Sequence, residues 1–214
     1  MRVLITGQTY YPGANGQAVF TIHLAEGLAA RGHEVMAIVP NSRLKAVHAV
    51  TKGVRVEKRP AVDLAFLHPD TLTTLPWDGG ISELMEAFQP EVVHIQDFYP
   101  LARVVLRAAR QRGLPIVGTN HFVPENLLYY FPRALQGKLT TSLLWKVALQ
   151  VYNHFDLITT PSRTAAEILR QQPIHIPVRA ISNGVRTERF RPLSSVDRAA
   201  VRQQLGLDPN QTLF

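Results

Sequence analysis

Short runs of consecutive apolar residues alternate with segments of helical periodicity along most of this 214-residue chain. Such runs are typical of strands that are buried on both faces, as the strands of a parallel sheet are. Their alternation with helices predicts an α/β fold built on a doubly wound parallel sheet. The predicted strands are residues 3–6, 34–39, 54–57, 91–95, 115–119, 157–160 and 178–181, of which the third alternates as an exposed strand does. The predicted helices are residues 16–31, 81–88, 101–112, 138–153, 163–171 and 194–205.

The composition excludes several other classes of protein. Hydrophobic residues make up 46% of the chain, which is too many for a disordered segment, and the length allows one large domain or two small ones. The absence of cysteine excludes a disulfide framework, a thiol nucleophile and any zinc site with cysteine ligands. No apolar run approaches the roughly 18 residues of a membrane-spanning helix, and the N-terminal run is too short for a signal peptide. We therefore expect a soluble cytoplasmic protein.

The formal net charge of +7 points to an anionic partner, for example a nucleic acid, a membrane surface or a phosphorylated small molecule. The charge is unevenly distributed, because residues 60–102 hold seven acidic residues and no lysine or arginine, whereas residues 43–59 and 103–146 are strongly basic. Two interpretations stay open. Helix surfaces are polar by necessity and the signs divide by chance, or the molecule has one surface that faces an anion.

In a doubly wound sheet, ligands bind outside the carboxyl ends of the strands where the strand order reverses, which is expected between the first and fourth predicted strands. The loop after the first strand, residues 7–16, leads directly into a helix. Gly13 and Gly16 permit a close approach of the backbone, and Asn15 is a good helix N-cap. The free N–H groups of the helix end favour a phosphate or another anion. An ordinary glycine-rich turn is the alternative interpretation.

Two more polar loops are expected at the same crevice, because they follow the fourth and fifth strands: residues 96–100 and residues 120–126. His121 directly follows a strand end beside other polar groups, which favours a functional over a structural histidine. His94 lies within a strand and is interpreted as a core residue whose polar groups are satisfied. The other six histidines lack the spacing of metal ligands, so no metal site is predicted.

The motifs of several common nucleotide-binding and hydrolytic sites are absent. The chain has no G-x-G-x-x-G after its first strand and no acidic residue after its second, which argues against a dinucleotide-dependent dehydrogenase. It has neither the G-x-x-x-x-G-K-[ST] of a P-loop protein nor the G-x-S-x-G of the usual serine hydrolases.

Several short motifs nevertheless resemble those of the family 4 retaining glycosyltransferases, and they follow in that family's order over nearly the whole chain. The motifs are Tyr11-Pro12, Asn15-Gly16, residues 24–28 and 31–35, Glu91-Val92-Val93-His94, Thr119-Asn120-His121, Thr160-Pro161-Ser162, and Ile181-Ser182-Asn183-Gly184-Val185 continuing to Arg189-Phe190-Arg191-Pro192. Three positions depart from the family's pattern: Asn15 replaces the commoner glycine, Ser182 a proline and Arg186 an aspartate.

The resemblance implies one half of a GT-B architecture, in which two Rossmann-like domains face each other across a cleft. Residues 1–192 would be the N-terminal acceptor domain, and residues 193–214 a linker helix and the start of a truncated donor-binding domain. The full enzyme would be a hexosyltransferase that moves a sugar from a UDP- or GDP-sugar to an acceptor, with no further cofactor. The fragment alone would lack activity.

The same resemblance implies roles for individual residues. His121 would face the transferred sugar as a catalytic residue. Three residues would bind the donor: Gly16 would approach its phosphate or sugar from the acceptor side, and Asn183 and Gly184 would line the cleft near the linker. The candidates for acceptor binding are polar residues of the three loops: Tyr10, Asn15, Gln17, Asp97, Asn120 and Glu125.

Two segments point to a membrane partner. Arg103, Arg107 and Arg110 share one face of the predicted helix 101–112, and residues 127–149 mix aromatic residues and leucines with basic residues. Such surfaces fit peripheral contact with anionic lipid on the inner face of a membrane, and hence a lipid or phosphorylated polyol as acceptor. The alternative is a solvated arginine face beside leucines and a tryptophan that face the core.

Two other functions stay open. A GT-B sugar-phosphate epimerase shares the fold and differs in the chemistry of its second half. The other is a non-enzymatic basic module that binds an anionic membrane or nucleic acid. A nucleic-acid module would carry aromatic residues interleaved with basic ones on a continuous platform, which we do not find, so no nucleic-acid partner is predicted.

Overall fold

The computed structural model describes residues 1–10, 15–41, 45–63, 72–74, 79–129, 131–185, 187, 190, 192–208 and 211. Its contacts divide the chain into two units, Met1–Ser182 and Asn183–Phe214. The domain boundary expected after residue 192 stays a prediction. Gly13 and Arg186, which the sequence singles out, lie outside the described residues.

The larger unit is an α/β fold whose elements mostly lie where the sequence predicts them. The strands are β1 (Arg2–Thr6), β2 (Glu34–Asn41), β3 (Val47–Thr51), β4 (Val54–Asp63), β5 (Leu72–Thr74), β6 (Val92–Ile95), β7 (Ile116–Thr119), β8 (Leu157–Thr160) and β9 (Val178–Ala180). The helices are α1 (Gly16–Ala30), α2 (Ile81–Phe88), α3 (Pro100–Gln111), α4 (Pro124–Leu128), the 3₁₀ helix η1 (Arg133–Leu135), α5 (Lys138–Tyr152) and α6 (Arg163–Arg170), with α7 (Ser195–Gln204) in the second unit. Four of these elements, β3, β5, α4 and η1, are additional to the predicted ones.

The described strands form one nine-stranded sheet in the order β3-β4-β2-β1-β6-β7-β8-β9, with β5 paired to β4. The strands from β4 to β9 in this order run parallel to their neighbours, whereas β3 and β5 pair antiparallel with β4. Thr6 of β1 lies opposite Ile95 of β6, so the carboxyl ends of these two strands are side by side. The doubly wound sheet and its reversal between β1 and β6 are therefore confirmed.

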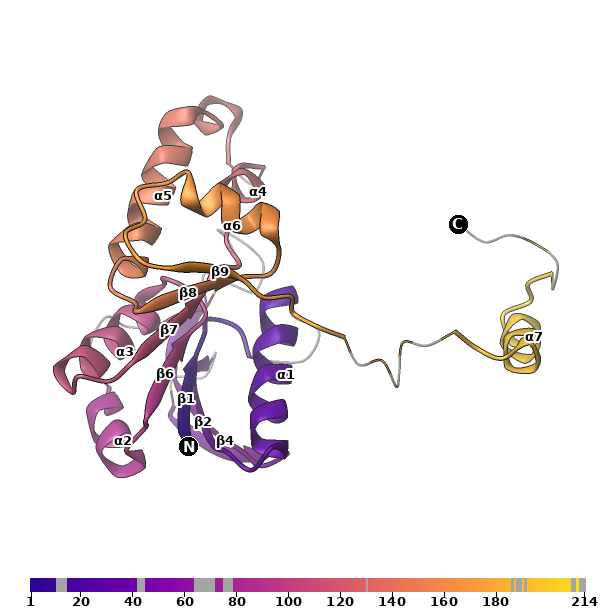
Figure 1. Ribbon diagram of the computed structural model, residues 1–214, viewed down its shortest axis with the longest axis horizontal. Coiled ribbons are helices and arrows are strands. Elements are labelled where there is room, and N and C mark those ends of the chain that lie inside the picture. Colours follow the sequence, from indigo (N-terminus) through magenta and orange to yellow (C-terminus); the bar gives the residue numbers. More distant parts are fainter. Residues whose placement is uncertain are drawn as a thin grey trace. The chain divides into compact units, whose positions relative to one another are not determined.

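Two apolar clusters cover the two faces of the sheet. Leu4 of β1 belongs to the cluster with α2, α3, α5 and α6, whereas its neighbours Val3 and Ile5 belong to the cluster with α1. Figure 1 shows α1 on one side of the sheet and α2 and α3 on the other. Because successive residues of a strand point to opposite faces, a sheet covered on both sides needs apolar residues at every position. The covering of both faces of the sheet therefore explains the uninterrupted apolar runs in the sequence.

β4 departs from the exposed strand that its alternation predicts, because Glu57 is only 1% exposed. Its carboxylate accepts a hydrogen bond from Nε of Arg55 at 2.6 Å, pairs with Nδ1 of His48 and lies 3.6 Å from Nη2 of Arg59. A buried carboxylate needs such partners. Part of the basic charge of residues 43–59 therefore stabilises the fold and is not available to a ligand.

Candidate functional site

Three segments of the chain meet at the carboxyl edge of β1 and β6, and Asp97 joins them. Its Oδ2 accepts hydrogen bonds from the backbone N–H of Gln8, at 2.5 Å, and from Nε2 of Gln17, at 3.0 Å. Its Oδ1 accepts a hydrogen bond from the backbone N–H of Tyr99 at 3.1 Å. Gln8 follows β1, Gln17 lies in the first turn of α1, and Asp97 follows β6. One carboxyl group therefore fixes the start of α1 against the neighbouring strand.

The Asp97 side chain is buried, with 4% of the residue exposed. Burial raises the pKa of its carboxyl group to about 6, although the hydrogen bonds from Gln8, Tyr99 and Gln17 act in the opposite direction. The shift is upward because the donors around this carboxylate are neutral N–H groups, which offset only part of the cost of desolvating a charge. Asp97 is therefore a carboxyl group at the predicted crevice that changes its protonation state near pH 6.

The first turn of α1 is open to an anion. As predicted, Asn15 is the N-cap, because its Oδ1 accepts hydrogen bonds from the backbone N–H of Ala18, at 2.9 Å, and from Oγ1 of Thr9, at 3.2 Å. Within the described residues, no acceptor bonds the backbone N–H groups of Gly16 and Gln17. A Cβ added to Gly16 would meet no atom within 4 Å. Among the described residues, the helix end therefore combines N–H donors that have no acceptor with open space beside Gly16.

His121 follows β7, the strand next to β6, and contacts α1 and the residue that directly follows β6. Its Nε2 lies 3.1 Å from Oε1 of Gln96, the residue before Asp97. The ring of Phe20, from α1, packs against the imidazole with ring centroids 5.0 Å apart. Burial lowers the pKa of His121 to about 4, so the imidazole is neutral at pH 7. The structure thus brings a neutral histidine beside the residue that precedes Asp97.

His94 is joined to threonines of the two strands beyond it, in agreement with its interpretation as a core residue. Thr159 donates its hydroxyl proton to the carbonyl oxygen of Gly118 at 3.2 Å, so its Oγ1 accepts the proton of Thr119 at 2.8 Å. Oγ1 of Thr119 then accepts a hydrogen bond from Nε2 of His94 at 2.7 Å. Burial, with a smaller contribution from His121, lowers the pKa of His94 to about 4. The chain of donors therefore begins at a neutral histidine and ends on the carbonyl oxygen of Gly118.

Two of the predicted acceptor residues have partners in the protein interior. Asn120 is 2% exposed, and its Oδ1 accepts hydrogen bonds from the hydroxyl of Tyr152, at 3.1 Å, and from the backbone N–H of Phe122, at 2.9 Å. Tyr10 packs against the apolar cluster that α1 covers. The structure thus gives each of these two residues a place in the packing of the domain. Their part in acceptor binding stays a prediction.

Three further predicted residues belong to other parts of the chain. Glu125 lies in α4, the short helix that follows the exit of β7. Asn183 and Gly184 belong to the second unit, and the φ of +67° at Gly184 is one that favours glycine. Their positions at a cleft stay predictions.

The site also contains two glutamines that the sequence analysis does not list among its candidates. Gln8 and Gln96 directly follow the adjacent strands β1 and β6, and both are buried. Both amide atoms of Gln8, and Nε2 of Gln96, lack a hydrogen-bond partner within the described residues. Unsatisfied buried amides are costly and call for an explanation. Their positions directly after the two strands were the signal by which the sequence could have identified these glutamines. No such signal exists for the contact of Tyr152 with Asn120.

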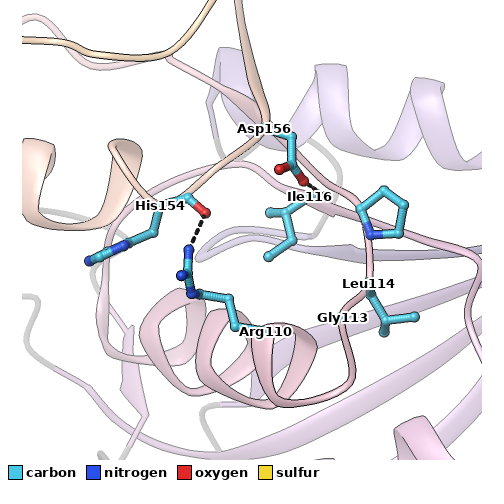
Figure 2. A pocket seen from close by; sticks show the side chains of 7 residues that line it. Arg110, Gly113, Leu114, Ile116, His154 and Asp156 are labelled. Carbon is cyan, nitrogen blue, oxygen red and sulfur yellow. Dashed lines mark hydrogen bonds between the residues drawn. The ribbon is translucent and has the colours of Figure 1, made fainter.

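A pocket lies at the opposite edge of the sheet, where the parallel strands begin. Hydrogen bonds between the residues that line it join neighbouring elements of the fold. Figure 2 shows the residues that line it, which are Arg110, Gly113, Leu114, Pro115, Ile116, His154 and Asp156. Oδ2 of Asp156 accepts a hydrogen bond from the backbone N–H of Ile116 at 2.7 Å, and Nη1 of Arg110 donates to the carbonyl oxygen of His154 at 3.2 Å. These contacts join α3 and β7 to the segment before β8. None of the predicted site residues lines this pocket.

No group of three histidine, aspartate or glutamate residues that could hold a metal ion occurs among the residues that the structure describes. The arrangement at the β1–β6 edge instead combines three kinds of group: N–H donors of α1 that have no acceptor among the described residues, the buried carboxyl group of Asp97 and the neutral imidazole of His121. Such a set can bind phosphate and hydroxyl groups of a ligand.

Comparisons with known proteins extend the resemblance. The model of Glycosyltransferase Family 4 matches residues 14–189. A GDP-mannose-dependent alpha-mannosyltransferase of Mycobacterium tuberculosis is 28% identical over 200 residues, which cover 90% of this chain and 50% of the relative. An alpha-monoglucosyldiacylglycerol synthase of Streptococcus pneumoniae is 22% identical over 218 residues, which cover 100% of this chain and 48% of the relative.

Among solved structures, a sucrose-phosphate synthase of Thermosynechococcus elongatus shares the fold. The two structures superpose with a TM-score of 0.71 at 17% sequence identity, over 97% of this chain and 53% of the other. This chain therefore spans about half the length of that synthase and of the curated relatives it matches.

Proposed function

Because the chain belongs to glycosyltransferase family 4, we propose that it is the acceptor-binding half of a retaining hexosyltransferase with the GT-B fold. In this proposal the donor is a UDP- or GDP-sugar, and a second, donor-binding half completes the enzyme, so the chain alone is inactive. The relatives support it, since one is a mannosyltransferase that depends on GDP-mannose and the other is the synthase of a glucosylated diacylglycerol.

One observation carries the proposal: the convergence of three polar groups at the β1–β6 edge. They are the open first turn of α1, the carboxyl group of Asp97 and the imidazole of His121. The N–H groups of α1 favour the negative charge of a nucleotide diphosphate. A neutral His121 can accept a hydrogen bond from a sugar hydroxyl, and Asp97 holds the side chain of Gln17 at the first turn of α1. Sugar transfer needs this combination, because the leaving group is anionic and the reacting hydroxyl groups must be oriented.

Replacement of His121 tests the proposal. We expect His121→Ala, in the enzyme that comprises both halves, to lower the rate of transfer by roughly 10²- to 10⁴-fold, the range for a positioned catalytic group. The measurement uses radiolabelled GDP-mannose and UDP-glucose with a diacylglycerol and a phosphorylated polyol as acceptors. His154→Ala is the matched control, because His154 is exposed and lies at the amino edge of the sheet. A near-normal rate for His121→Ala would contradict the proposal, and an epimerised donor formed without acceptor would favour the epimerase alternative.

The segment from α4 to the first turns of α5 presents an apolar surface. Tyr129, Leu135, Leu139 and Leu143 are 83%, 53%, 89% and 59% exposed, and we call these four residues the α4–α5 surface. Leu139 and Leu143 are one helical turn apart and share a face of α5, whereas Trp145 is buried. One face of α5 therefore carries exposed leucines, which suit contact with a membrane. Its opposite face carries Trp145, which belongs to the core, as the alternative interpretation of residues 127–149 expects.

The charged residues of the segment that carries the α4–α5 surface are all basic. Arg133, Lys138 and Lys146 are exposed among its apolar residues, and the chain has no aspartate or glutamate between Glu125 and Asp156. Leucine and tyrosine side chains surrounded by lysine and arginine are typical of surfaces that bind anionic bilayers peripherally.

Two arginines of α3 contribute to packing within the protein and not to a surface for lipid. Nη2 of Arg103 donates a hydrogen bond to the carbonyl oxygen of Val147 at 3.1 Å, and Nη1 of Arg110 donates to that of His154 at 3.2 Å. Both contacts bind α3 to α5 and to the residues that follow it. These two arginines therefore contribute to packing, which favours the structural alternative for this helix.

We propose that the α4–α5 surface lies on an anionic membrane, on its inner, cytoplasmic face, and that the acceptor is a lipid or phosphorylated polyol presented there. α5 leads from the end of β7 to the start of the adjacent parallel strand β8, so its first turn lies at the same carboxyl edge as Asp97 and His121. No helix among the described residues is long and apolar enough to cross a bilayer. In this proposal the α4–α5 surface contacts the lipid, and the acceptor's head group is directed to the β1–β6 edge.

Vesicle binding tests this proposal. We expect the chain to co-sediment with phosphatidylcholine vesicles that contain phosphatidylserine, and to lose affinity in high salt or without the anionic lipid. Leu139→Ser/Leu143→Ser should weaken binding at least about tenfold, because a buried leucine contributes roughly 1.5–3 kcal/mol. Val50→Ser, at a 77% exposed position of β3, is the matched control. No binding to either vesicle, or equal binding by the double variant, would contradict the proposal.

A further inference from the structure

Gln96 is buried at the junction of β1 and β6. It is 0% exposed, and its backbone N–H donates a hydrogen bond to the carbonyl oxygen of Thr6 at 2.9 Å. Its side chain packs so closely on Gly7 that a Cβ added there would lie 3.1 Å from Cβ of Gln96. A side chain fixed in this way can impose an orientation on the group it contacts.

That group is the imidazole of His121, whose Nε2 lies 3.1 Å from Oε1 of Gln96. A carbonyl oxygen only accepts hydrogen bonds, so the contact requires a proton on Nε2. A neutral imidazole has one N–H, and Nδ1 of His121 then bears the lone pair. Nδ1 has no hydrogen-bond partner within the described residues, and the ring is partly exposed. The packing of Phe20 against the ring restricts its rotation.

We propose that Gln96 is a positioning residue, which holds His121 as the Nε2–H tautomer and leaves Nδ1 as a hydrogen-bond acceptor for a hydroxyl group of the substrate. The hydroxyl contact rests on the proposed function, whereas the tautomer rests on the structure alone. A neutral amide suits this task better than a carboxylate would. A glutamate at this position would also accept from Nε2–H, but its charge would favour a second proton on Nδ1 and abolish the acceptor.

The tautomer can be observed directly by ¹⁵N NMR of the histidine ring nitrogens in the chain itself. In the wild-type chain at pH 7 we expect a protonated Nε2 and an unprotonated Nδ1 for His121. Gln96→Leu removes the acceptor, so the Nδ1–H tautomer should gain population several-fold. Gln96→Glu should keep the tautomer at high pH and raise the midpoint of the His121 titration by about one pH unit or more. Gln111→Leu, at the far end of α3, is the control and should change neither the tautomer of His121 nor the midpoint of its titration.

If the Gln96 amide were turned over, its NH₂ group would donate to Nε2 of His121, and the proton of the neutral ring would lie on Nδ1. A proton on Nδ1 in the wild type therefore overturns the proposal. So does a His121 spectrum that Gln96→Leu leaves unchanged. The second arm is kinetic and uses the enzyme that comprises both halves. For Gln96→Glu we expect the acid limb of the kcat profile to move upward by the same shift as the NMR titration, with the KM for the donor within about twofold of the wild type.

The two arms separate the two proposals. A displaced titration with an unchanged kcat profile would overturn the part that assigns Nδ1 to a substrate hydroxyl. An absence of sugar transfer by the wild-type enzyme would contradict the proposed function and leave the NMR result for Gln96 valid by itself. A change in folding is monitored by circular dichroism, and Gln96→Glu, which keeps the shape and the acceptor, decides the matter if Gln96→Leu does not fold.

Discussion

Gly118 occupies a position in β7 where no other residue fits. A Cβ added there would lie 2.2 Å from Cδ2 and 2.4 Å from Cε2 of Phe155, far inside van der Waals contact. Phe155 is itself 3% exposed and packed in the core, so its ring has little room to move away. We expect Gly118→Ala to lower the free energy of unfolding by about 1–3 kcal/mol through overpacking, as measured by urea denaturation.

Gly137 provides the control, because a Cβ added there would meet no atom within 4 Å and its φ of −129° suits any residue. Gly137→Ala should lower the unfolding free energy less than Gly118→Ala does, by about 1 kcal/mol at most, because Gly137 is the N-cap of α5 and alanine caps a helix less well than glycine. Gly118→Ala/Phe155→Leu should recover part of the loss, since the smaller side chain vacates the space. Equal stability of the two single variants would refute the steric explanation. The sequence could not reveal this constraint, because Phe155 reaches Gly118 only through the folding of the chain.

At the scale of elements, Asp97 connects the exit of β6 with the exit of β1 and the start of α1. Its two oxygens accept three N–H donors, and an asparagine offers one oxygen and places an N–H₂ group against the remaining donors. We expect Asp97→Asn to lower the free energy of unfolding by about 1–3 kcal/mol. The amide protons of the first turn of α1 should also exchange faster with solvent.

The matched control is Asp156→Asn. Among the described residues Asp156 accepts one backbone hydrogen bond, from Ile116, which the oxygen of an asparagine can retain, so a small loss is expected there. If both substitutions lower the free energy of unfolding by the same amount, the three hydrogen bonds that Asp97 accepts are not what stabilises the loop. Urea denaturation and hydrogen exchange measure both variants.

The elements show how far the sequence predicts this site. The adjacency of β1 and β6 follows from uninterrupted apolar runs and from the rules for parallel connections, and it brings Asp97 and Gln17 to one edge. The hydrogen bond between them depends on side-chain directions that no pattern encodes. β3 was not predicted because an edge strand with mostly exposed residues lacks an apolar run. Tyr152 reaches Asn120 only because α5 packs beside β7, which is a property of the tertiary fold.

At the scale of the whole molecule, three buried titratable groups make stability depend on pH. Burial lowers the pKa values of His94 and His121 to about 4. Between pH 4 and 6.5 the unfolded chain therefore binds up to two protons more at these residues, and their contribution to the free energy of unfolding rises with pH. Burial raises the pKa of Asp97 to about 6. From about pH 4 to 6 the folded chain binds one proton more there, and the contribution of Asp97 falls as the pH rises.

The two histidines together outweigh the single aspartate, so the free energy of unfolding should rise by about 2 kcal/mol from pH 4 to pH 6, at about 1.4 kcal/mol for each net proton and pH unit. His121→Gln removes one of the two rising contributions and leaves the other nearly balanced against Asp97. Its curve should therefore be almost flat over the same range, as measured by urea denaturation at half-unit steps of pH. His154→Gln, at an exposed position, should follow the wild-type curve. A wild-type stability that falls from pH 4 to pH 6 would contradict the lowered pKa values of the two histidines, because only the falling contribution of Asp97 would then remain.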